Sequence, residues 1–357
     1  MEYQVELCEI VKNYKAFRAV DHINLQIRRG DIVSLLGASG CGKTTTLRMI
    51  AGLIAPTEGQ VKIEGTDVTS LPPYKRDVAM VFQNYALFPH LTVFENVVYG
   101  LRNRKIRDKK VLREKADSVL SIVQLEGSEE KYPRQLSGGQ QQRVSLARAL
   151  IVNPKVMLFD EPLSNLDAKL RVQTRTEIRN LLKQMNITAL YVTHDQEEAL
   201  TISDQIAVMN KGRIEQLALP ADLYNKPETR FVADFIGHAN LFEGSIHIQD
   251  GAALLNIGND MQLRCGTVPG RGEEGKKKTV LIRPENIHLA LEPDGSVNCF
   301  PGKVRERNFL GSVIRYIVEL PSGQRLEAEV HPSSGVSEEQ TEVYVSFEPE
   351  NTILIEG

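Results

Sequence analysis

The sequence IVSLLGASGCGKTTTLRMIAG, residues 32–52, decides the fold class of this 357-residue chain. It begins with a short, almost wholly apolar run, which is typical of a strand that is buried on both faces. A glycine-rich segment follows, and then Leu47, Ile50 and Ala51 recur at helical spacing before Gly52, a residue type that commonly ends helices. The stretch therefore predicts a strand, a loop and a helix in direct succession.

The loop of this unit matches the phosphate-binding pattern G-x-x-x-x-G-K-[ST] over residues 37–44. Glycine lets backbone N–H groups converge on a phosphate, and the N-terminus of the following helix adds the positive end of its dipole. Lys43 is expected to reach the β- and γ-phosphates of a nucleotide, and the Thr44 hydroxyl is expected to bind Mg²⁺. Cys41 is expected to contribute only its backbone. The residues predicted to bind ATP here are Gly37, Ala38, Ser39, Gly40, Cys41, Gly42, Lys43, Thr44 and Thr45.

Two further runs have the composition of buried strands, VMLF at residues 156–159 and TALYVT at residues 188–193. Alternating strands and helices indicate an α/β fold with a parallel sheet. The segment VMLFDEP delivers Asp160 and Glu161 to the carboxyl end of its strand, where α/β sheets bind their ligands. Asp160 is placed to hold Mg²⁺ and Glu161 to polarise a water for attack on the γ-phosphate.

The helix between these two runs is predicted from four apolar residues at helical spacing, namely Ile178, Leu181, Leu182 and Met185. The stretch from about residue 91 to 152 lacks strand-like runs and predicts an inserted helical subdomain. From residue 236 onward, short alternating strands with glycine and proline turns predict a small β-barrel or sandwich. The boundaries expected are therefore 1–235 and 236–357, with YNKPETRFVADFIGHAN as the linker.

The β-region carries a weak internal repeat. VLIRPENIHL (residues 280–289) is echoed by VSFEPENTILI (residues 345–355), and FEG at Phe242 is a further candidate echo of FPG at Phe300. Two such halves are expected to pair into one closed unit.

Composition excludes several classes of protein. The chain is 41% hydrophobic and 25% charged, which is ordinary globular composition, and its net charge of −3 provides no general attraction for nucleic acid or anionic membranes. The four cysteines lie far apart without metal-ligand spacing, which favours a reducing compartment. No signal peptide or membrane span is expected, so any membrane role would need a partner.

A third motif, LSGGQ at residues 136–140, is followed by QQRVSLARAL with helical spacing. After a phosphate-binding loop and before an apolar strand ending in Asp-Glu, it resembles the signature motif of ATP-binding-cassette (ABC) ATPases. The resemblance implies that the signature residues contact the γ-phosphate of an ATP held by another subunit. These residues are Ser137, Gly138, Gly139 and Gln140.

Four further residues match motifs of that family in the expected order. Tyr14 resembles the aromatic residue that stacks on adenine, and Gln83 resembles the glutamine that touches Mg²⁺ and the attacking water. Asp167 resembles the aspartate that communicates across the dimer, and His194 the switch histidine beside the γ-phosphate. Ala38 stands where proline is usual and Thr45 where serine often appears, and neither change removes a phosphate donor or a metal ligand.

The resemblance covers essentially the whole chain. Within the family, the chain resembles the ATPases of the importers for maltose, polyamines, ferric iron and phosphonates. The resemblance implies an α/β ATPase domain with a helical insertion, followed by a regulatory β-domain of the transport-associated oligonucleotide-binding (TOBE) type. It also implies a homodimer with two shared ATP sites, two transmembrane permease subunits and, indirectly, an extracytoplasmic solute-binding protein. Such a subunit acts at the cytoplasmic face of the bacterial inner membrane, as a peripheral protein.

Several alternatives remain open at this point. A polyamine substrate is favoured. Ferric iron, 2-aminoethylphosphonate, an opine and a sugar stay open as alternatives, because the ATPase need not touch the solute. A soluble ABC ATPase of DNA repair or translation is disfavoured, since the chain has one cassette and only a short helical insertion. A chiefly ligand-sensing role is a further alternative. No nucleic-acid partner is expected, because the β-region lacks a basic aromatic platform.

Overall fold

The chain folds as two compact units, Met1–Ala221 and Asp222–Gly357. The computed structural model describes residues 3–249, 251–258, 261–267, 273–333, 336 and 341–355. The boundary lies before the one that the change in sequence texture indicated at residue 235. The physical reason is that the predicted linker is helical and packs within the second unit, as described below.

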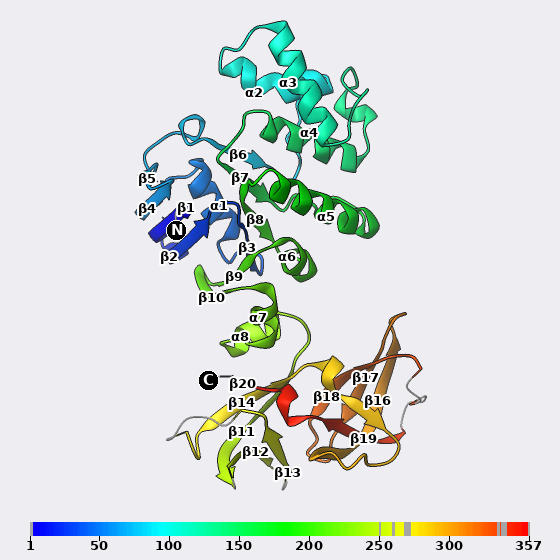
Figure 1. The fold of residues 1–357 in the computed structure, drawn as a ribbon. Helices are drawn as coiled ribbons and strands as arrows, with labels where there is room; N and C mark the ends of the chain where they lie inside the picture. The colour runs from blue at the N-terminus through cyan, green and yellow to red at the C-terminus, as the bar shows by residue number, and fades with distance from the viewer. Residues whose placement is uncertain are drawn as a thin grey trace. The chain divides into compact units, whose positions relative to one another are not determined.

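The first unit is built around a six-stranded sheet in the order β10-β9-β3-β8-β7-β6 (Figure 1). Neighbouring strands are parallel from β9 to β6 in this order, and the edge strand β10 is antiparallel to β9. The strands are β3 (Ile32–Gly37), β6 (Val78–Val81), β7 (Val156–Asp160), β8 (Thr188–Thr193), β9 (Gln205–Asn210) and β10 (Arg213–Ala218). The three strands expected from apolar runs, β3, β7 and β8, lie side by side in the sheet.

A second, antiparallel sheet of this unit has the order β2-β1-β4-β5. Its strands are β1 (Tyr3–Tyr14), β2 (Phe17–Arg28), β4 (Glu58–Ile63) and β5 (Thr66–Asp67). The helices of the unit are α1 (Lys43–Ala51), α2 (Val93–Asn103), α3 (Lys109–Ile122), α4 (Gly138–Leu150), α5 (Ala168–Gln184) and α6 (Gln196–Ile202). Two single-turn helices, Pro73–Lys75 and Pro133–Gln135, complete it.

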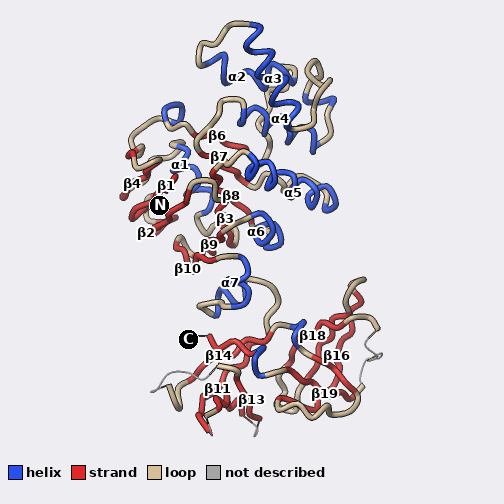
Figure 2. The backbone as a smooth tube through the Cα atoms, viewed as in Figure 1, coloured by secondary structure: helices blue, strands red, loops and turns tan. Residues whose placement is uncertain are grey.

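The six-stranded sheet is buried on both faces, which explains its continuous apolar runs. Val33 and Leu35 of β3 pack toward α1 and the antiparallel sheet. Phe159 of β7 and Tyr191 of β8 belong to the opposite core, which also includes residues of α2, α3, α4 and α5. Figures 1 and 2 show α2, α3 and α4 as a separate helical group.

The ends of two predicted helices are set by left-handed residues. Helix α1 stops at Gly52, whose φ of 77° fits the expected glycine C-cap. Helix α5 ends at Gln184, so Met185 lies outside the helix whose apolar face it was predicted to continue, and it is 37% exposed. The cause is Asn186, whose φ of 51° turns the chain toward β8.

The second unit contains two antiparallel five-stranded sheets, in the orders β13-β12-β11-β14-β20 and β15-β19-β16-β17-β18. The first comprises β11 (Asn240–Gln249), β12 (Ala252–Gly258), β13 (Met261–Cys265), β14 (Lys277–Ile282) and β20 (Thr352–Ile355). The second comprises β15 (His288–Ala290), β16 (Asn298–Phe309), β17 (Ile314–Glu319), β18 (Arg325–Val330) and β19 (Glu342–Phe347). One core unites apolar residues of both sheets, as the expected barrel or sandwich requires.

The internal repeat is visible in the strand register. Phe242 of β11 pairs with Val280 of β14, and Phe300 of β16 pairs with Val345 of β19. Both Pro-Glu-Asn segments, Pro284–Asn286 and Pro349–Asn351, form a single helical turn. After each turn the chain enters the other sheet, because β15 pairs with β19 and β20 pairs with β14. The two halves thus complete each other's sheets, which is the closed pairing that the repeat predicted.

Helix α8 (Arg230–Phe235) lies within the predicted linker, helix α7 (Pro220–Asn225) ends at its start, and Arg283 contacts both. Arg283 is 1% exposed, and its guanidinium donates to the carbonyl oxygens of Tyr224, Ala233 and His238 at 3.0, 3.2 and 2.9 Å. The same group lies 4.1 Å from the centre of the Tyr224 ring, a cation–π contact. Arg283 directly follows β14, and its hydrogen bonds therefore hold α7 and α8 against the end of that strand.

We expect Arg283→Ala to destabilise the second unit by about 3 kcal/mol, because three carbonyl groups lose a charged donor in a buried place. Urea unfolding followed by circular dichroism and by tyrosine fluorescence measures the effect. The matched control is Arg264→Ala, since Arg264 is exposed and uses its backbone to bond Asn298. Its effect should stay within about 0.5 kcal/mol. Equal stability of the two variants would contradict the role given to Arg283.

Candidate functional site

The predicted phosphate-binding loop joins the end of β3 to the start of α1. Gly42 caps α1 with a φ of 107°, a conformation that residues with a side chain rarely adopt. A Cβ atom at Gly42 would also lie 2.6 Å from the carbonyl oxygen of Ala19. Glycine is therefore required at this position both for the turn and for the close approach of β2.

The ammonium group of Lys43 lies within this loop. Its Nζ donates to the carbonyl oxygens of Gly37 at 2.7 Å and Ala38 at 3.0 Å, and the residue is only 5% exposed. It also lies 3.9 Å from the sulfur of Cys41, which is itself buried. A positive charge is thus placed where the loop's backbone N–H groups and the α1 N-terminus already favour an anion.

Thr44 and Asp160 meet at the carboxyl edge of the sheet. The Thr44 hydroxyl donates to Oδ1 of Asp160 at 3.0 Å, and Arg48 lies 4.0 Å from the other carboxylate oxygen. Burial raises the pKa of Asp160 above its ordinary value, with the Thr44 hydrogen bond acting in the opposite direction. Hydroxyl and carboxylate oxygens are ligands that Mg²⁺ prefers, and Mg²⁺ commonly takes one or two protein ligands beside phosphate and water. The pair fits a magnesium ion bound together with a nucleotide.

Within the described residues, no group of three or more His, Cys, Asp or Glu side chains is placed to hold a metal by itself. A cage formed by the protein alone is therefore not part of the described structure. The donor set of Thr44 and Asp160 suits a cation that brings its other ligands with it, as Mg²⁺ bound to a nucleotide does.

We expect Asp160→Asn to gain stability relative to the wild type as the pH rises from about 4, the usual pKa of aspartate, toward 7. Because the pKa of Asp160 is raised in the folded state, the folded protein holds this proton more tightly than the unfolded one, and its stability falls with rising pH. Thermal unfolding without nucleotide measures the difference. Added Mg²⁺ and ATP should stabilise the wild type and have much less effect on the variant. A difference in stability that does not change with pH would contradict the assignment.

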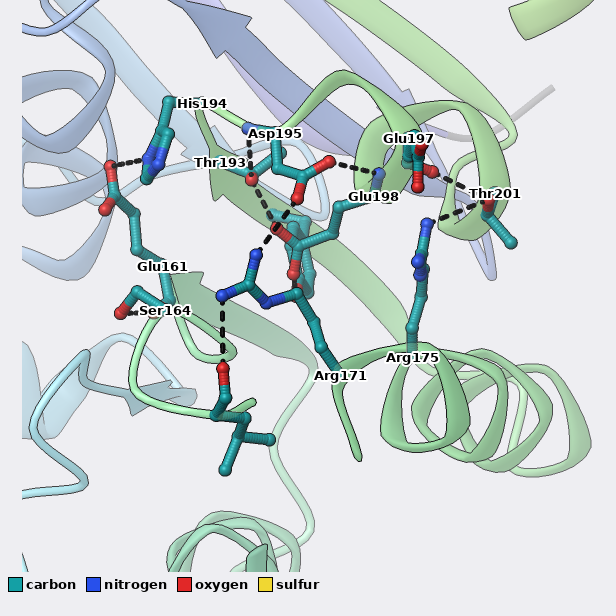
Figure 3. Close-up of polar contacts among 12 residues, drawn as sticks. Glu161, Ser164, Arg171, Arg175, Thr193, His194, Asp195, Glu197, Glu198 and Thr201 are labelled. Atoms are coloured by element: carbon teal, nitrogen blue, oxygen red, sulfur yellow. Dashed lines mark hydrogen bonds and ion pairs between the residues drawn. The ribbon is translucent and has the colours of Figure 1, made fainter. Parts of the chain in front are cut away.

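Glu161 and His194 face each other at the ends of β7 and β8 (Figure 3). Nδ1 of His194 lies 3.2 Å from Oε1 of Glu161. Glu161 adopts a φ of 45° just after β7, and its backbone N–H donates to the carbonyl oxygen of Val192 at 3.0 Å. A cavity of about 60 Å³ adjoins both side chains, enough for a few water molecules. The arrangement places a carboxylate, an imidazole and water at one edge of the sheet.

The signature residues predicted at 137–140 begin helix α4. The Ser137 hydroxyl accepts from the backbone N–H of Gln140 at 3.3 Å, and the Gln140 side chain accepts from the N–H of Ser137 at 3.0 Å. This is a capping box, and it leaves the exposed N-terminus of α4 open to an anion. Helix α4 packs on α2 and α3, and no hydrogen bond described for this chain joins residues 137–140 to residues 37–45.

The other predicted residues are exposed and lie in different elements. Tyr14 ends β1 with 45% of its surface exposed, and the Lys12 ammonium lies 5.2 Å from its ring centre. Asp167 caps helix α5 by accepting from the N–H of Leu170 at 3.0 Å. The Gln83 side chain is exposed, and its carbonyl oxygen accepts from Nδ2 of Asn165 at 2.8 Å. The roles assigned to these residues stay predictions.

Sequence reasoning missed the residues that join the loops of this site. We call residues 163–167 the aspartate loop and residues 193–195 the histidine loop. Asn165 bonds the aspartate loop to Gln83, and Arg171 bonds it to Asp195, as Figure 3 shows for Arg171. The one available signal was Asp195, which stands before a helical pattern as an N-cap should. Nothing in the sequence pairs Arg171 with it.

None of the helices in the described part of the chain is both long and apolar enough to cross a membrane. The longest of them, α5, has 17 residues and carries several charged side chains.

Two regions of the chain match known protein families. Residues 20–164 match the ABC transporter family, and residues 280–355 match the TOBE domain. Among solved structures, a dimeric ATP-binding cassette, MJ0796, in a post-hydrolysis state bound to ADP and Pi shares 34% identity and a TM-score of 0.55. It covers 60% of this chain, and 98% of its own length is matched. The cassette subunit CbiO1 of Clostridium perfringens gives a TM-score of 0.58 at 27% identity, over 62% of this chain and 91% of its own.

Several curated relatives span nearly the whole chain. The spermidine/putrescine import ATP-binding protein PotA of Thermobifida fusca is 44% identical over 99% of this chain and 94% of its own length. PotA of Rubrobacter xylanophilus is 48% identical over 91% of this chain and 85% of its own. The Fe(3+) ions import ATP-binding protein FbpC 1 of Rhizobium meliloti is 44% identical over 98% of this chain and 96% of its own. With both domain matches in order and this similarity along the whole chain, the protein belongs to the ATP-binding subunits of ABC importers.

Proposed function

We propose that this chain is the ATP-hydrolysing subunit of an ABC importer for polyamines such as spermidine and putrescine. The observation that carries the proposal is the edge formed by β3, β7 and β8, where Lys43, Thr44–Asp160 and Glu161–His194 are assembled. The polyamine assignment is supported by the relatives named for spermidine/putrescine import, which match this chain over almost its full length.

ATP binding is proposed to use residues 37–45 for the phosphates and Tyr14 for the adenine ring. Lys43 neutralises the β- and γ-phosphates. Its ammonium group gives up its hydrogen bonds to the carbonyl oxygens of Gly37 and Ala38 when it binds them. Thr44, Asp160 and Gln83 hold Mg²⁺, which supplies positive charge to the phosphates of the leaving and transferred groups. Tyr14 is exposed at a strand end, as a residue that stacks on a ligand must be.

Hydrolysis is proposed to rest on Glu161 and His194. The Glu161 carboxylate accepts a hydrogen bond from the attacking water and orients it toward the γ-phosphate. His194, whose ring contacts Glu161 in this structure, is proposed to turn toward the γ-phosphate oxygens as ATP is bound. The protein's main contribution is the placement of charge before the reaction, since phosphoryl transfer requires little covalent chemistry from the enzyme.

The functional unit is proposed to be a head-to-tail homodimer with two ATP molecules in its interface. Ser137 and Gly138 at the N-terminus of α4 are exposed for a second copy, and no described hydrogen bond joins residues 137–140 to the phosphate-binding loop of the same chain. Asp167, exposed at the start of α5, is proposed to face the partner as well. Each site is then incomplete without the other chain.

The dimer is proposed to bind two transmembrane permease subunits at the cytoplasmic face of the bacterial inner membrane. An extracytoplasmic binding protein delivers the solute to the permeases, so the ATPase acts on transport without touching the substrate. The segment 84–97, NYALFPHLTVFENV, is proposed as the permease contact, because the loop that it forms before α2 is unusually apolar and aromatic.

Deletion of the gene tests this function through solute uptake. Cells without the chain should lose energy-dependent uptake of labelled spermidine and putrescine, and the wild-type gene should restore it. The Lys43→Ala variant should not restore uptake. Co-purification from detergent-solubilised membranes should bring two hydrophobic permease chains with the wild-type protein. Unchanged polyamine uptake in the deletion strain would overturn the substrate assignment.

Ferric iron is the second candidate substrate, favoured by the Rhizobium meliloti relative at 44% identity. The same deletion strain distinguishes the two, because loss of labelled Fe³⁺ uptake with intact polyamine uptake would reassign the importer. Loss of neither, with ATP hydrolysis by the purified chain, would favour a different solute.

A further inference from the structure

Three loops of the proposed catalytic site are connected by two side chains to which no role has been given. The first is Asn165 of the aspartate loop, whose Nδ2 donates to the carbonyl oxygen of Gln83 at 2.8 Å. The second is Arg171 of α5, which reaches from the aspartate loop to the histidine loop. The aspartate loop is therefore held from both sides within one chain.

Arg171 makes this second connection with two of its nitrogen atoms (Figure 3). Nη2 donates to the carbonyl oxygen of Leu166 at 3.1 Å, and Nη1 lies 3.4 Å from Oδ2 of Asp195. Because a guanidinium is planar and rigid, it fixes the distance between its two acceptors better than a flexible ammonium would. A displacement of Leu166 is thus passed to Asp195, the residue next to His194.

Asp195 is itself firmly held, so the connection does not end in a mobile side chain. Its Oδ1 accepts from the backbone N–H of Glu198 at 3.0 Å and caps helix α6. Its own N–H donates to the Thr193 hydroxyl at 3.0 Å. The buried Glu198 carboxylate in turn accepts from the hydroxyls of Thr193 and Tyr191. The histidine loop therefore moves as one body with the start of α6.

The position of Arg171 relative to the reacting groups is also specific. Arg171, Glu161 and His194 all line the cavity of about 60 Å³ in which an attacking water would be placed. His194 and Glu161, which contact each other, are both among the residues that line it. Errors of about 1 Å in such groups reduce rates by about 100-fold, so the register of the histidine loop bears directly on the reaction.

We propose that Arg171 is a positioning residue that couples the aspartate loop to His194. This inference rests on the proposed ATP hydrolysis at Glu161 and on an aspartate loop that faces a second copy of the chain. Movement of the aspartate loop, when that copy arrives, is transmitted through Leu166, Arg171 and Asp195 to the histidine loop. His194 then takes its catalytic position only in an assembled dimer.

The test compares Arg171→Ala with Arg179→Ala, a control on the same helix. Both arginine side chains are 32% exposed, and both contact one aspartate and one carbonyl oxygen. Arg179 instead binds Ile202, the last residue of α6, and Asp204, both outside the two loops. Steady-state ATP hydrolysis by the purified full-length chain gives kcat and KM for each, and thermal unfolding reports folding.

We expect Arg171→Ala to lower kcat by about 10- to 100-fold, while KM for ATP changes by less than about twofold. Arg179→Ala should leave both constants within about twofold of the wild type. If Arg171→Ala does not fold, Arg171→Met, which keeps the aliphatic stem and removes the donors, takes its place. A purely structural effect would lower the unfolding temperature and the active fraction of both variants alike.

A double-mutant cycle with Asp195→Asn isolates the coupling. This substitution keeps an N-cap for α6 and removes the charge that faces Arg171. Each single variant should lose a similar factor in kcat, and the double variant should lose no more than the worse single one. The coupling would be overturned if the two single losses in kcat multiplied in the double variant. It would also be overturned by an unchanged kcat in Arg171→Ala or by an equal loss of kcat in Arg179→Ala. A wild-type chain that hydrolyses no ATP would instead overturn the proposed function on which the coupling rests.

Discussion

Replacement of Glu161 by glutamine is expected to reduce ATP turnover by about 100-fold or more and to leave ATP binding intact. Glutamine has nearly the same shape, so the left-handed backbone at residue 161 and its N–H bond to Val192 are retained. The carboxylate that accepts a hydrogen bond from the attacking water and orients it is lost. Phosphate release measures turnover, and titration with a fluorescent ATP analogue measures affinity.

The control for Glu161→Gln is the same substitution at Glu197, an exposed residue of α6 drawn in the same view (Figure 3). Its turnover should match that of the wild type within about twofold. The Glu161 variant should also accumulate as an ATP-bound dimer in size-exclusion chromatography, because hydrolysis would no longer separate the chains. Hydrolysis at the wild-type rate by the Glu161 variant would remove Glu161 from the mechanism.

Two inactive variants of this chain are expected to restore hydrolysis when they are mixed. Lys43→Ala removes the phosphate-binding ammonium, and Ser137→Arg fills the N-terminus of α4 with a bulky cation. In a head-to-tail dimer each ATP site takes Lys43 from one chain and Ser137 from the other. A mixed dimer of the two variants therefore contains one complete site and one site with both defects.

Each variant alone should hydrolyse ATP at a small fraction of the wild-type rate, with a loss of about 100-fold. An equimolar mixture should recover up to about a quarter of the wild-type rate, since half of the dimers are mixed and each has one intact site. The control mixes Lys43→Ala with Glu161→Gln, where both defects fall on the same side of the site. If the first mixture stays as inactive as its components, the sites are not shared in the proposed way.

Much of the first unit could be predicted from the sequence, because each of its elements is specified by residues within its own short stretch. An apolar run such as residues 188–193 fits only a strand covered on both faces, and that is where β8 lies. Gly52, predicted to end a helix, and Gly42, predicted in the phosphate-binding loop, both have positive φ values. Helix α4 follows the signature residue Ser137 and covers the stretch whose spacing predicted a helix.

The internal repeat of the second unit and the pairing of its halves could also be predicted, whereas the exchange of strands between the two sheets could not. Matching Pro-Glu-Asn segments indicated two halves, and the structure pairs Phe242 with Val280 in one and Phe300 with Val345 in the other. That each half gives its last strand to the other sheet depends on long-range pairing, for which sequence carries no local signal. The helical linker was missed for a similar reason, because Arg283 acts from a distant strand.

By itself, the sequence determined the chemistry available to this protein. A phosphate-binding loop, an acidic strand end and a capped signature helix are each specified by residues within one short stretch, whose backbone demands are local. Only the tertiary structure decided how these parts act on one another. Arg171 and Asp195 are 24 residues apart, and Asn165 and Gln83 are 82 apart. They meet because the order of β6, β7 and β8 brings their loops to one edge, and that order follows from packing the whole sheet.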